Sequence, residues 1–329
     1  MKRLQTRSTT ARKQSGLFRT LSHPSRHRRL AIATVLFGLG VTVFVIPAIA
    51  TPSRTSSAAT VVHSYVALGD SFTSGPGIPV QLGPRTGPSA PGQCMRSSDS
   101  YPFLTARALG LALRDVSCAG ATTEDLTASQ GPGIPAQLSA LRSSTSLVSI
   151  GIGGNDLGFS TIAADCVAAT PWGITKVGWS CRSHYTADGV NQLTVAVHRV
   201  GSKVATSLKE IRARAPHARV FVIGYPDIFP SSGSGCWPRL PFSTHDLDYL
   251  RSIEMDLDAS LAGDAARAGD GYVDMATPSA SHDACADSNS RWVEPLVLTS
   301  GGYPLHPSSL GMADMAEIVE RAFTSAESR

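Results

Sequence analysis

The stretch that decides the fold is Ser64–Gly75, which reads SYVALGDSFTSG. Its first five residues form a short, mostly apolar run that leads into the turn Gly69-Asp70-Ser71, a pattern typical of a buried strand followed by a helix. A serine at such a turn has its hydroxyl at the carboxyl edge of the sheet and its N–H near a helix N-terminus, where negative charge is stabilised. Ser71 can therefore be a nucleophile and an oxyanion donor, and a serine that only caps the helix is the alternative.

The same alternation of short β-branched runs and longer segments of helical period continues along the chain. It predicts strands at 64–68, 113–117, 147–152, 219–223 and 271–275, and helices at 100–109, 191–215, 244–268 and 307–323. The stretches rich in Gly, Pro and Ser are expected to be loops: 76–93, 166–181 and 228–243. This order predicts an α/β domain with a parallel sheet, whose functional residues lie in the loops after the strands.

Two further polar residues lie at the ends of predicted elements, where they can take part in catalysis. The run 147–152 leads into Gly153-Gly154-Asn155-Asp156, which places an asparagine amide at a strand end. Near the C-terminus, His306 stands directly before Pro307 and the last predicted helix. A serine, a histidine and an asparagine can supply a nucleophile, a base and a donor to a developing oxyanion.

Together these residues resemble the GDSL-type, or SGNH, family of serine hydrolases. Gly69-Asp70-Ser71 is similar to the first sequence block of that family, Gly153-x-Asn155-Asp156 to the third and His306 to the fifth. The second block, a glycine on a loop after the second strand, would be Gly120. The resemblance implies a three-layer α/β/α, flavodoxin-like fold with a central parallel sheet of about five strands.

The resemblance also implies a role for each residue. Ser71 Oγ would attack an ester carbonyl, and His306 would take its proton and return it to the leaving alcohol. The N–H groups of Ser71 and Gly120 and the side-chain amide of Asn155 would form the oxyanion hole. No metal or cofactor is required. Two acids beside these positions are expected to bond backbone N–H groups, namely Asp70 and Asp156.

The chain departs from the family at one position. The family usually has an aspartate three residues before the histidine, whereas this chain has Tyr303. Some other group must then hold the imidazole in the correct tautomer. We predict a Ser71–His306 dyad whose histidine donates to a backbone carbonyl, that of Tyr303. The alternative is an acid from elsewhere in the chain, with Asp283 or Asp287 as candidates.

The N-terminal segment has a composition different from the rest. Of the 29 Lys and Arg residues, nine lie among the first 50, where there is no acidic residue; this leaves 20 against 25 Asp and Glu, a net charge of −5 for residues 51–329. A basic stretch followed by the uncharged run 30–50 predicts a signal peptide at 1–50, with a retained membrane anchor as the alternative. Residues 51–60 are expected to be a flexible linker and 61–325 the hydrolase domain. The acidic body argues against a nucleic-acid partner.

Six cysteines lie in the part predicted to be exported. An even number in an oxidising compartment favours three disulfides, with buried free thiols as the alternative. Six cysteines allow fifteen pairings, of which nearest-neighbour pairing gives Cys94–Cys118, Cys166–Cys181 and Cys236–Cys285. With the export segment, these cysteines make the chain resemble the secreted actinobacterial lipases and esterases of the family.

The sequence therefore predicts a secreted, monomeric lipase or esterase that acts on small-molecule or lipid esters and contacts lipid surfaces transiently. Two alternatives remain open. One is a carbohydrate O-acetyl esterase, since the same catalytic set removes acetyl groups from polysaccharides. The other is a secreted binding protein that has kept the fold without catalysis.

Overall fold

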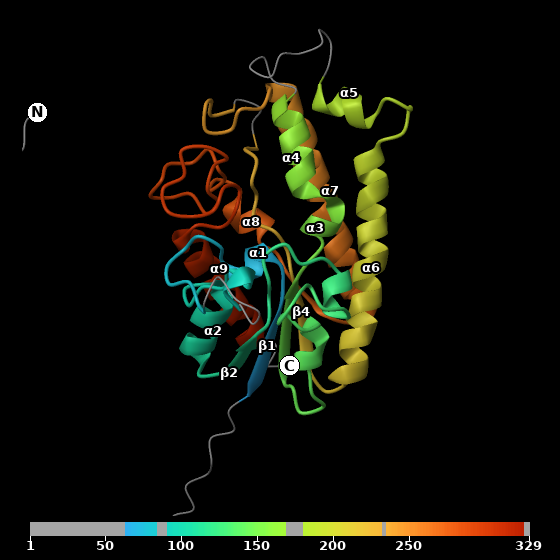
Figure 1. Cartoon of the computed structure of the whole chain (residues 1–329), viewed down its shortest axis with the longest axis vertical. Helices are drawn as coiled ribbons and strands as arrows, with labels where there is room; N and C mark the ends of the chain where they lie inside the picture. Colours follow the sequence, from blue (N-terminus) through green and yellow to red (C-terminus); the bar gives the residue numbers. More distant parts are fainter. Residues whose placement is uncertain (1–62, 84–90, 169–179, 232–234, 326–329) are drawn as a thin grey trace, which may run out of the picture. The chain divides into compact units, whose positions relative to one another are not determined.

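The computed structural model describes residues 63–83, 91–168, 180–231 and 235–325 (Figure 1). The predicted signal peptide at 1–50, the linker at 51–60 and the start of the domain at residue 61 lie outside these ranges. Among the described helices, none is long and apolar enough to cross a membrane.

The core is a five-stranded sheet of parallel strands in the order β2-β1-β3-β4-β5. The strands are β1 (Ser64–Gly69), β2 (Ala112–Asp115), β3 (Leu147–Gly151), β4 (Arg219–Ile223) and β5 (Gly271–Val273). The predicted parallel sheet is confirmed. Strand β2 ends before Ser117, where the prediction placed its end, because Asp115 Oδ1 accepts hydrogen bonds from both the N–H and the hydroxyl of Ser117 and turns the chain.

The two faces of the sheet are covered because both sides of each central strand are apolar, as is usual in parallel sheets. In β1, Tyr65 and Ala67 pack into one hydrophobic cluster, and Val66 and Leu68 pack into the other. The first cluster lies against α2 (Tyr101–Leu109) and α9 (Ser309–Ser325), and the second against α6 (Gln192–Arg214) and α7 (Thr244–Ala268). Figure 1 shows α2 and α9 on one side of the sheet and α6 on the other. The three-layer α/β/α architecture is confirmed.

The long helices begin and end at local signals in the sequence. Asn191 caps α6 and Ser243 caps α7, each through a side-chain oxygen that accepts a backbone N–H. Gly110 ends α2 and Gly269 ends α7 in the left-handed conformation. The other helices are shorter: α1 (Ser71–Ser74), α3 (Gly154–Leu157), α4 (Phe159–Ala168), α5 (Cys181–Tyr185), α8 (Ala276–Ser279), and the 3-10 turns Pro91–Cys94, Glu124–Leu126 and Gln137–Ala140.

Three disulfides are present in the described part of the chain. The pairs are Cys94–Cys118, Cys166–Cys181 and Cys236–Cys285, as nearest-neighbour pairing predicts. The second links the end of α4 to the start of α5, although the sequence reading placed Cys166 in a loop. In the chain-entropy model, closing a loop of about 15 residues stabilises the folded state by about 3 kcal/mol.

The strand order places two of the predicted functional loops side by side. The order 2-1-3-4-5 is that of doubly wound flavodoxin-like sheets, in which ligands bind outside the carboxyl ends of the strands at the point where the order reverses. In this chain that point lies between β1 and β3. The turn that contains Ser71 and the turn that contains Asn155 therefore leave neighbouring strands in the same direction.

Candidate active site

Ser71 is the first residue of α1, directly after the turn that ends β1. Asp70 precedes it as the helix cap, and Asp70 Oδ1 accepts the N–H of Phe72 at 2.9 Å. The turn requires glycine at position 69, where φ is 149° and an added Cβ would lie 2.3 Å from Thr73 Oγ1 and 2.5 Å from the Gly151 carbonyl oxygen. This tight packing of β1 against β3 holds the Ser71 hydroxyl at the carboxyl edge of the sheet.

His306 reaches Ser71 from the other end of the chain. Its Nε2 lies 2.7 Å from Ser71 Oγ, and its Nδ1 lies 2.7 Å from the carbonyl oxygen of Pro304. A carbonyl oxygen can only accept, so Nδ1 carries the proton and the neutral ring presents Nε2 as an acceptor for the Ser71 hydroxyl. This tautomer, assigned from the hydrogen-bond partners, is the one that a general base needs.

The predicted partner of His306, the Tyr303 carbonyl, is wrong by one residue. The Tyr303 carbonyl oxygen accepts the backbone N–H of His306 at 3.1 Å in a tight turn, whereas the imidazole Nδ1 lies 2.7 Å from the Pro304 carbonyl oxygen. The turn instead directs the Pro304 carbonyl oxygen toward Nδ1 of the imidazole. The backbone angles of the turn decide between two adjacent carbonyl groups, and a residue pattern does not reveal those angles.

Neither of the two alternative acids is the hydrogen-bond partner of His306 Nδ1, which is the Pro304 carbonyl. Asp283 Oδ1 accepts the N–H of Cys285 at 2.7 Å, and burial raises the pKa of this carboxyl. The Asp287 carbonyl oxygen accepts the N–H groups of Ser290 and Arg291. The Nδ1 partner of the histidine in this structure is therefore a backbone carbonyl and neither of these carboxylates.

The loop before His306 is fixed by a buried acid and its neighbours. The N–H of Glu294 donates to the His306 carbonyl at 2.9 Å, and the N–H of Leu305 donates to the Glu294 carbonyl at 3.0 Å. The Glu294 carboxylate in turn forms a buried salt bridge of 2.8 Å with Arg291. Leu305 itself has φ 58°, a left-handed conformation that is uncommon outside glycine. These contacts hold a strained backbone next to the imidazole.

The surroundings of His306 favour its neutral form. Burial lowers the pKa of the imidazole, although the hydrogen bond to the Pro304 carbonyl opposes this shift. The ring packs at a tilt against Phe72, with centroids 5.0 Å apart, and edge-on against Tyr303 at 5.3 Å. A neutral imidazole at neutral pH can accept the serine proton without first losing one of its own.

Asn155 lies on the second turn, at the start of α3. Its Nδ2 donates to the Ala121 carbonyl at 2.9 Å, which uses one of its two hydrogens. This contact connects the asparagine to the loop that contains Gly120. In the described part of the chain, the backbone N–H groups of Ser71 and Gly120 have no acceptor. Three donors thus remain free to bind an oxygen atom of a ligand.

The predicted contacts of the two neighbouring acids are confirmed. Asp70 Oδ1 accepts the N–H of Phe72, as described above. Asp156 accepts the N–H of Thr123 at 2.8 Å and its hydroxyl at 2.7 Å, and forms a salt bridge with Lys203 at 2.9 Å. Asp156 therefore holds the far end of the loop that contains Gly120.

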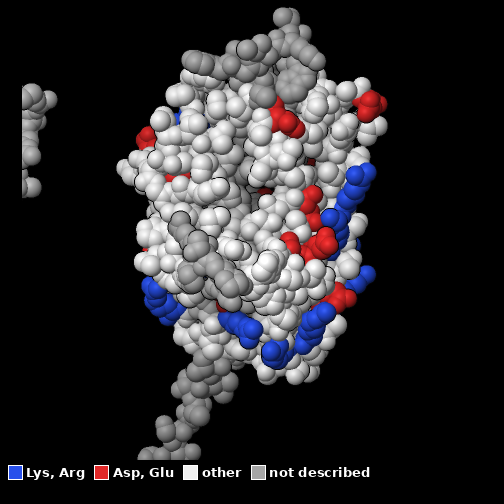
Figure 2. All heavy atoms as spheres, viewed as in Figure 1, with Lys and Arg blue, Asp and Glu red and all other residues white. Residues whose placement is uncertain are grey.

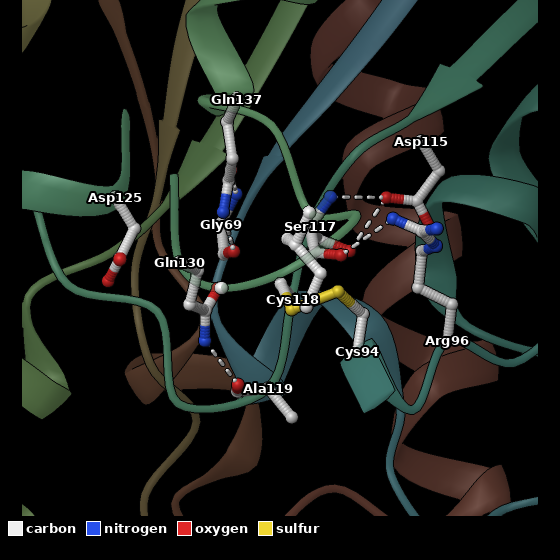
Figure 3. Close-up of a disulfide and its surroundings, with 12 residues drawn as sticks. Gly69, Cys94, Arg96, Asp115, Ser117, Cys118, Ala119, Asp125, Gln130 and Gln137 are labelled. Atoms are coloured by element: carbon white, nitrogen blue, oxygen red, sulfur yellow. Dashed lines mark hydrogen bonds between the residues drawn. A yellow bond between two sulfur atoms is a disulfide. The ribbon is translucent and has the colours of Figure 1, made fainter. Parts of the chain in front are cut away.

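A disulfide holds the near end of this loop (Figure 3). Cys118 is bonded to Cys94, its N–H donates to the Gly69 carbonyl at 3.0 Å, and the N–H of Ala119 donates to the Cys94 carbonyl at 3.0 Å. Gln130 Nε2 donates to the Ala119 carbonyl at 2.8 Å. The loop is thereby held on both sides of Gly120, whose φ of 78° is favourable only for glycine.

Ser71 and His306 both line an apolar cavity, and His306 also lines a neighbouring groove. Two acids line the cavity, Asp70 and Glu254. The rest of its wall consists mainly of apolar side chains of α1, α3, α4, α7 and nearby loops, among them Phe72, Leu157, Phe159, Ile162, Leu250 and Leu257. A second, more open groove lies beside His306 and is lined by residues that include Val167, Leu296, Tyr303 and Leu305.

The structure brings together Ser71, His306 and Asn155 and places Gly120 on an adjoining loop. The sequence reading missed Pro304, the cavity side chains of α7, and Tyr225, which lies in the loop after β4 and lines the cavity. Tyr225 follows a strand that the sequence did identify, so its position at a strand end was the available signal. The α7 side chains gave no signal, because apolar residues at helical spacing also form ordinary cores.

The chain is similar to known proteins in sequence and in fold. The model of the GDSL-like lipase/acylhydrolase family matches residues 67–313. Lipase 2 of Streptomyces coelicolor is 36% identical over 295 residues, which cover 87% of this chain and 92% of that protein. The crystal structure of phospholipase A1 from Streptomyces albidoflavus NA297 is 28% identical with a TM-score of 0.63, covering 80% of this chain and 99% of that one. That of the extracellular lipase from Streptomyces rimosus is 29% identical with a TM-score of 0.63, covering 79% and 100%. The resemblance seen in the sequence is confirmed: the chain belongs to the GDSL-like lipase/acylhydrolase family and is a carboxylic ester hydrolase.

Proposed function

We propose that this hydrolase is a secreted lipase or esterase that works through a Ser71–His306 dyad and a serine acyl-enzyme. One observation carries the proposal: Ser71 Oγ lies 2.7 Å from His306 Nε2, while the Pro304 carbonyl holds the other ring nitrogen in its protonated form. The catalytic domain is proposed to span residues 61–325.

The dyad performs two similar half-reactions. Ser71 Oγ attacks the ester carbonyl carbon while His306 Nε2 takes the hydroxyl proton, and the ring returns that proton to the leaving alcohol as the carbon–oxygen bond breaks. Water then attacks the acyl carbon and gives a proton to Nε2. The ring returns this proton to Ser71 Oγ as the bond between Oγ and the acyl carbon breaks, which releases the carboxylic acid. The Pro304 carbonyl stabilises the imidazolium that forms in each step, because its dipole accepts the Nδ1–H.

The oxyanion hole is proposed to consist of the Ser71 N–H, the Gly120 N–H and the Asn155 side-chain amide. The two backbone groups have no acceptor in the described residues, and Asn155 Nδ2 has one hydrogen left after its bond to Ala121. Loss of one such donor in other hydrolases raises the barrier by about 3 to 4 kcal/mol.

The substrate is proposed to be an ester with a medium or long acyl chain. The cavity beside Ser71 is lined mainly by apolar side chains, which suits an alkyl chain better than a sugar. The open groove on the other side of His306 would then accommodate the alcohol portion.

A lipid surface is a proposed transient contact of the monomer. Val297, Leu298 and Tyr303 are 40%, 68% and 48% exposed, and Tyr303 lines the open groove. In Figure 2 most of the visible Lys and Arg side chains lie along the lower rim and the right side of the molecule. The upper left, where Figure 1 places the loop that precedes α9, is mostly uncharged. Secretion is supported by the three disulfides and by the similarity to an extracellular lipase.

The test is hydrolysis of p-nitrophenyl esters of increasing chain length, together with labelling by a fluorophosphonate probe. Ser71→Ala should abolish both. The matched control is Ser74→Ala, because Ser74 is a buried serine of the same short helix whose hydroxyl has no partner in the described residues. Labelling that persists in Ser71→Ala would defeat the dyad, and activity confined to acetyl esters would favour the O-acetyl esterase.

A further inference from the structure

One tyrosine hydroxyl connects the turn that contains Ser71 to the turn that contains Asn155. Tyr225 follows β4 and is 5% exposed. Its hydroxyl donates to Asp70 Oδ2 at 2.6 Å and accepts the N–H of Gly154 at 2.9 Å. A phenol has a single hydrogen, which goes to the carboxylate, so the bond from Gly154 uses an oxygen lone pair. Both partners are direct sequence neighbours of proposed oxyanion donors.

The ring that carries this hydroxyl is fixed on several sides. The N–H of Tyr225 donates to Asp258 Oδ1 at 2.9 Å, and its ring packs edge-on against Phe72 with centroids 5.0 Å apart. On the far side, a Cβ added to Gly154 would lie 3.3 Å from the hydroxyl oxygen, tighter than ordinary contact. The position of the Gly154 N–H is therefore set by the tyrosine, with little space for adjustment.

The acceptor in the bond from the Tyr225 hydroxyl is a buried acid, Asp70. Hydrogen bonds to a carboxylate are shorter and stronger than those between neutral groups. Burial raises the pKa of Asp70 to about 7, and the hydrogen bonds from Tyr225 and from the Phe72 N–H oppose that rise. The tyrosine thus helps Asp70 to remain an acceptor that holds the first turn of α1.

We propose that Tyr225 is a positioning residue for ester hydrolysis: through Asp70 and Gly154, its hydroxyl sets the spacing between the Ser71 N–H and the Asn155 amide, so that both donate to one oxyanion. This inference rests on the proposed function. Tyr225 contributes no proton to the reaction and acts through its neighbours. The spacing matters most when charge develops on the substrate oxygen, because preorganised donors act chiefly in the transition state.

The decisive variant is Tyr225→Phe, which keeps the ring and the cavity wall and removes only the hydroxyl. We expect kcat for a p-nitrophenyl ester to fall about 10- to 100-fold while KM stays within about twofold, which is the signature of an interaction made in the transition state. Inhibition by an alkyl boronic acid, which forms a tetrahedral adduct with the serine, should weaken by about the same factor as kcat/KM.

The matched control is Tyr272→Phe. Tyr272 also donates its hydroxyl to a buried acid, Asp258 Oδ1, at 3.1 Å, but it belongs to β5 and does not line the cavity. The kcat of Tyr272→Phe and its inhibition by the boronic acid should stay within about twofold of the parent values, even if the variant unfolds at a lower denaturant concentration. If Tyr225→Phe does not fold, Gly154→Ala tests the same contact from the other side and should lower kcat with KM unchanged.

The results separate this inference from the proposed function. A parent enzyme that is not labelled by a fluorophosphonate at Ser71 would overturn both. An active, labelled parent whose Tyr225→Phe variant keeps kcat and boronate affinity within twofold would overturn only the inference. The inference would also be overturned if kcat fell as much in Tyr272→Phe as in Tyr225→Phe, or if Tyr225→Phe raised KM and left kcat unchanged. Either result would indicate that Tyr225 has a purely structural role.

Discussion

Replacement of Asn155 by alanine should separate catalysis from stability in one variant. The Asn155 amide has two hydrogens, of which one bonds the Ala121 carbonyl at 2.9 Å and the other is free for the oxyanion. Loss of the oxyanion donor should raise the barrier by about 3 kcal/mol, which lowers kcat about 150-fold. Loss of the bond to Ala121 should lower the free energy of unfolding by about 1 kcal/mol.

The measurements are kcat and KM on a p-nitrophenyl ester and unfolding in urea with the disulfides intact. Asn191→Ala is the matched control, because the Asn191 side chain caps α6 by accepting the N–H groups of Leu193 and Thr194. It should lose about 1 kcal/mol of stability with kcat unchanged. A folded Asn155→Ala protein whose kcat falls less than tenfold would refute the role given to this amide, and a comparable loss of kcat in Asn191→Ala would show that stability alone is responsible.

Three other predictions follow from the site and its surroundings. Asp283→Asn and Asp287→Asn should each leave kcat within about threefold, and a loss of the order of 10⁴, the scale for a triad carboxylate, would show that an acid orients His306 after all. Because burial lowers the pKa of His306 below 6.5, kcat/KM should fall with decreasing pH only through that lower pKa; an acid limb above 6.5 would contradict a neutral base. Burial raises the pKa of Asp258 from 3.8 to about 7, so the folded state binds this proton more tightly than the unfolded chain and loses stability as pH rises between those values. That loss is about 4 kcal/mol in all, and Asp258→Asn should flatten the dependence of urea unfolding on pH between 4 and 7; an unchanged slope would assign it to other groups.

Much of the fold could be read from short-range patterns. The runs at 64–68 and 219–223 became β1 and β4 with boundaries within a residue, since a buried parallel strand is a continuous apolar run that needs no distant information. The predicted helices at 191–215 and 244–268 became α6 and α7, because their capping residues lie in the sequence itself. Helix α4 was missed, as Phe159–Ala168 is an apolar, weakly periodic segment beside a stretch rich in Gly and Pro.

The candidate site divides in the same way. Ser71, Asn155 and His306 could be named from the sequence because each stands at the end of an element that local residues define. Their partners could not, since Pro304 differs from Tyr303 only in which carbonyl a turn directs toward the ring. Tyr225 likewise becomes significant only when the ends of β1, β3 and β4 are brought together.

The sequence was enough to identify most of the strands and long helices, the three chemical groups of the site and the family resemblance. It could do so because these depend on residue type and on spacing over a few positions. The folded structure was needed to see which carbonyl orients His306, which hydroxyl joins Asp70 to Gly154, and which side chains of α7 line the cavity. These contacts join residues far apart in the chain or depend on backbone angles in a turn, and their geometry exists only once the sheet has assembled and its loops have packed.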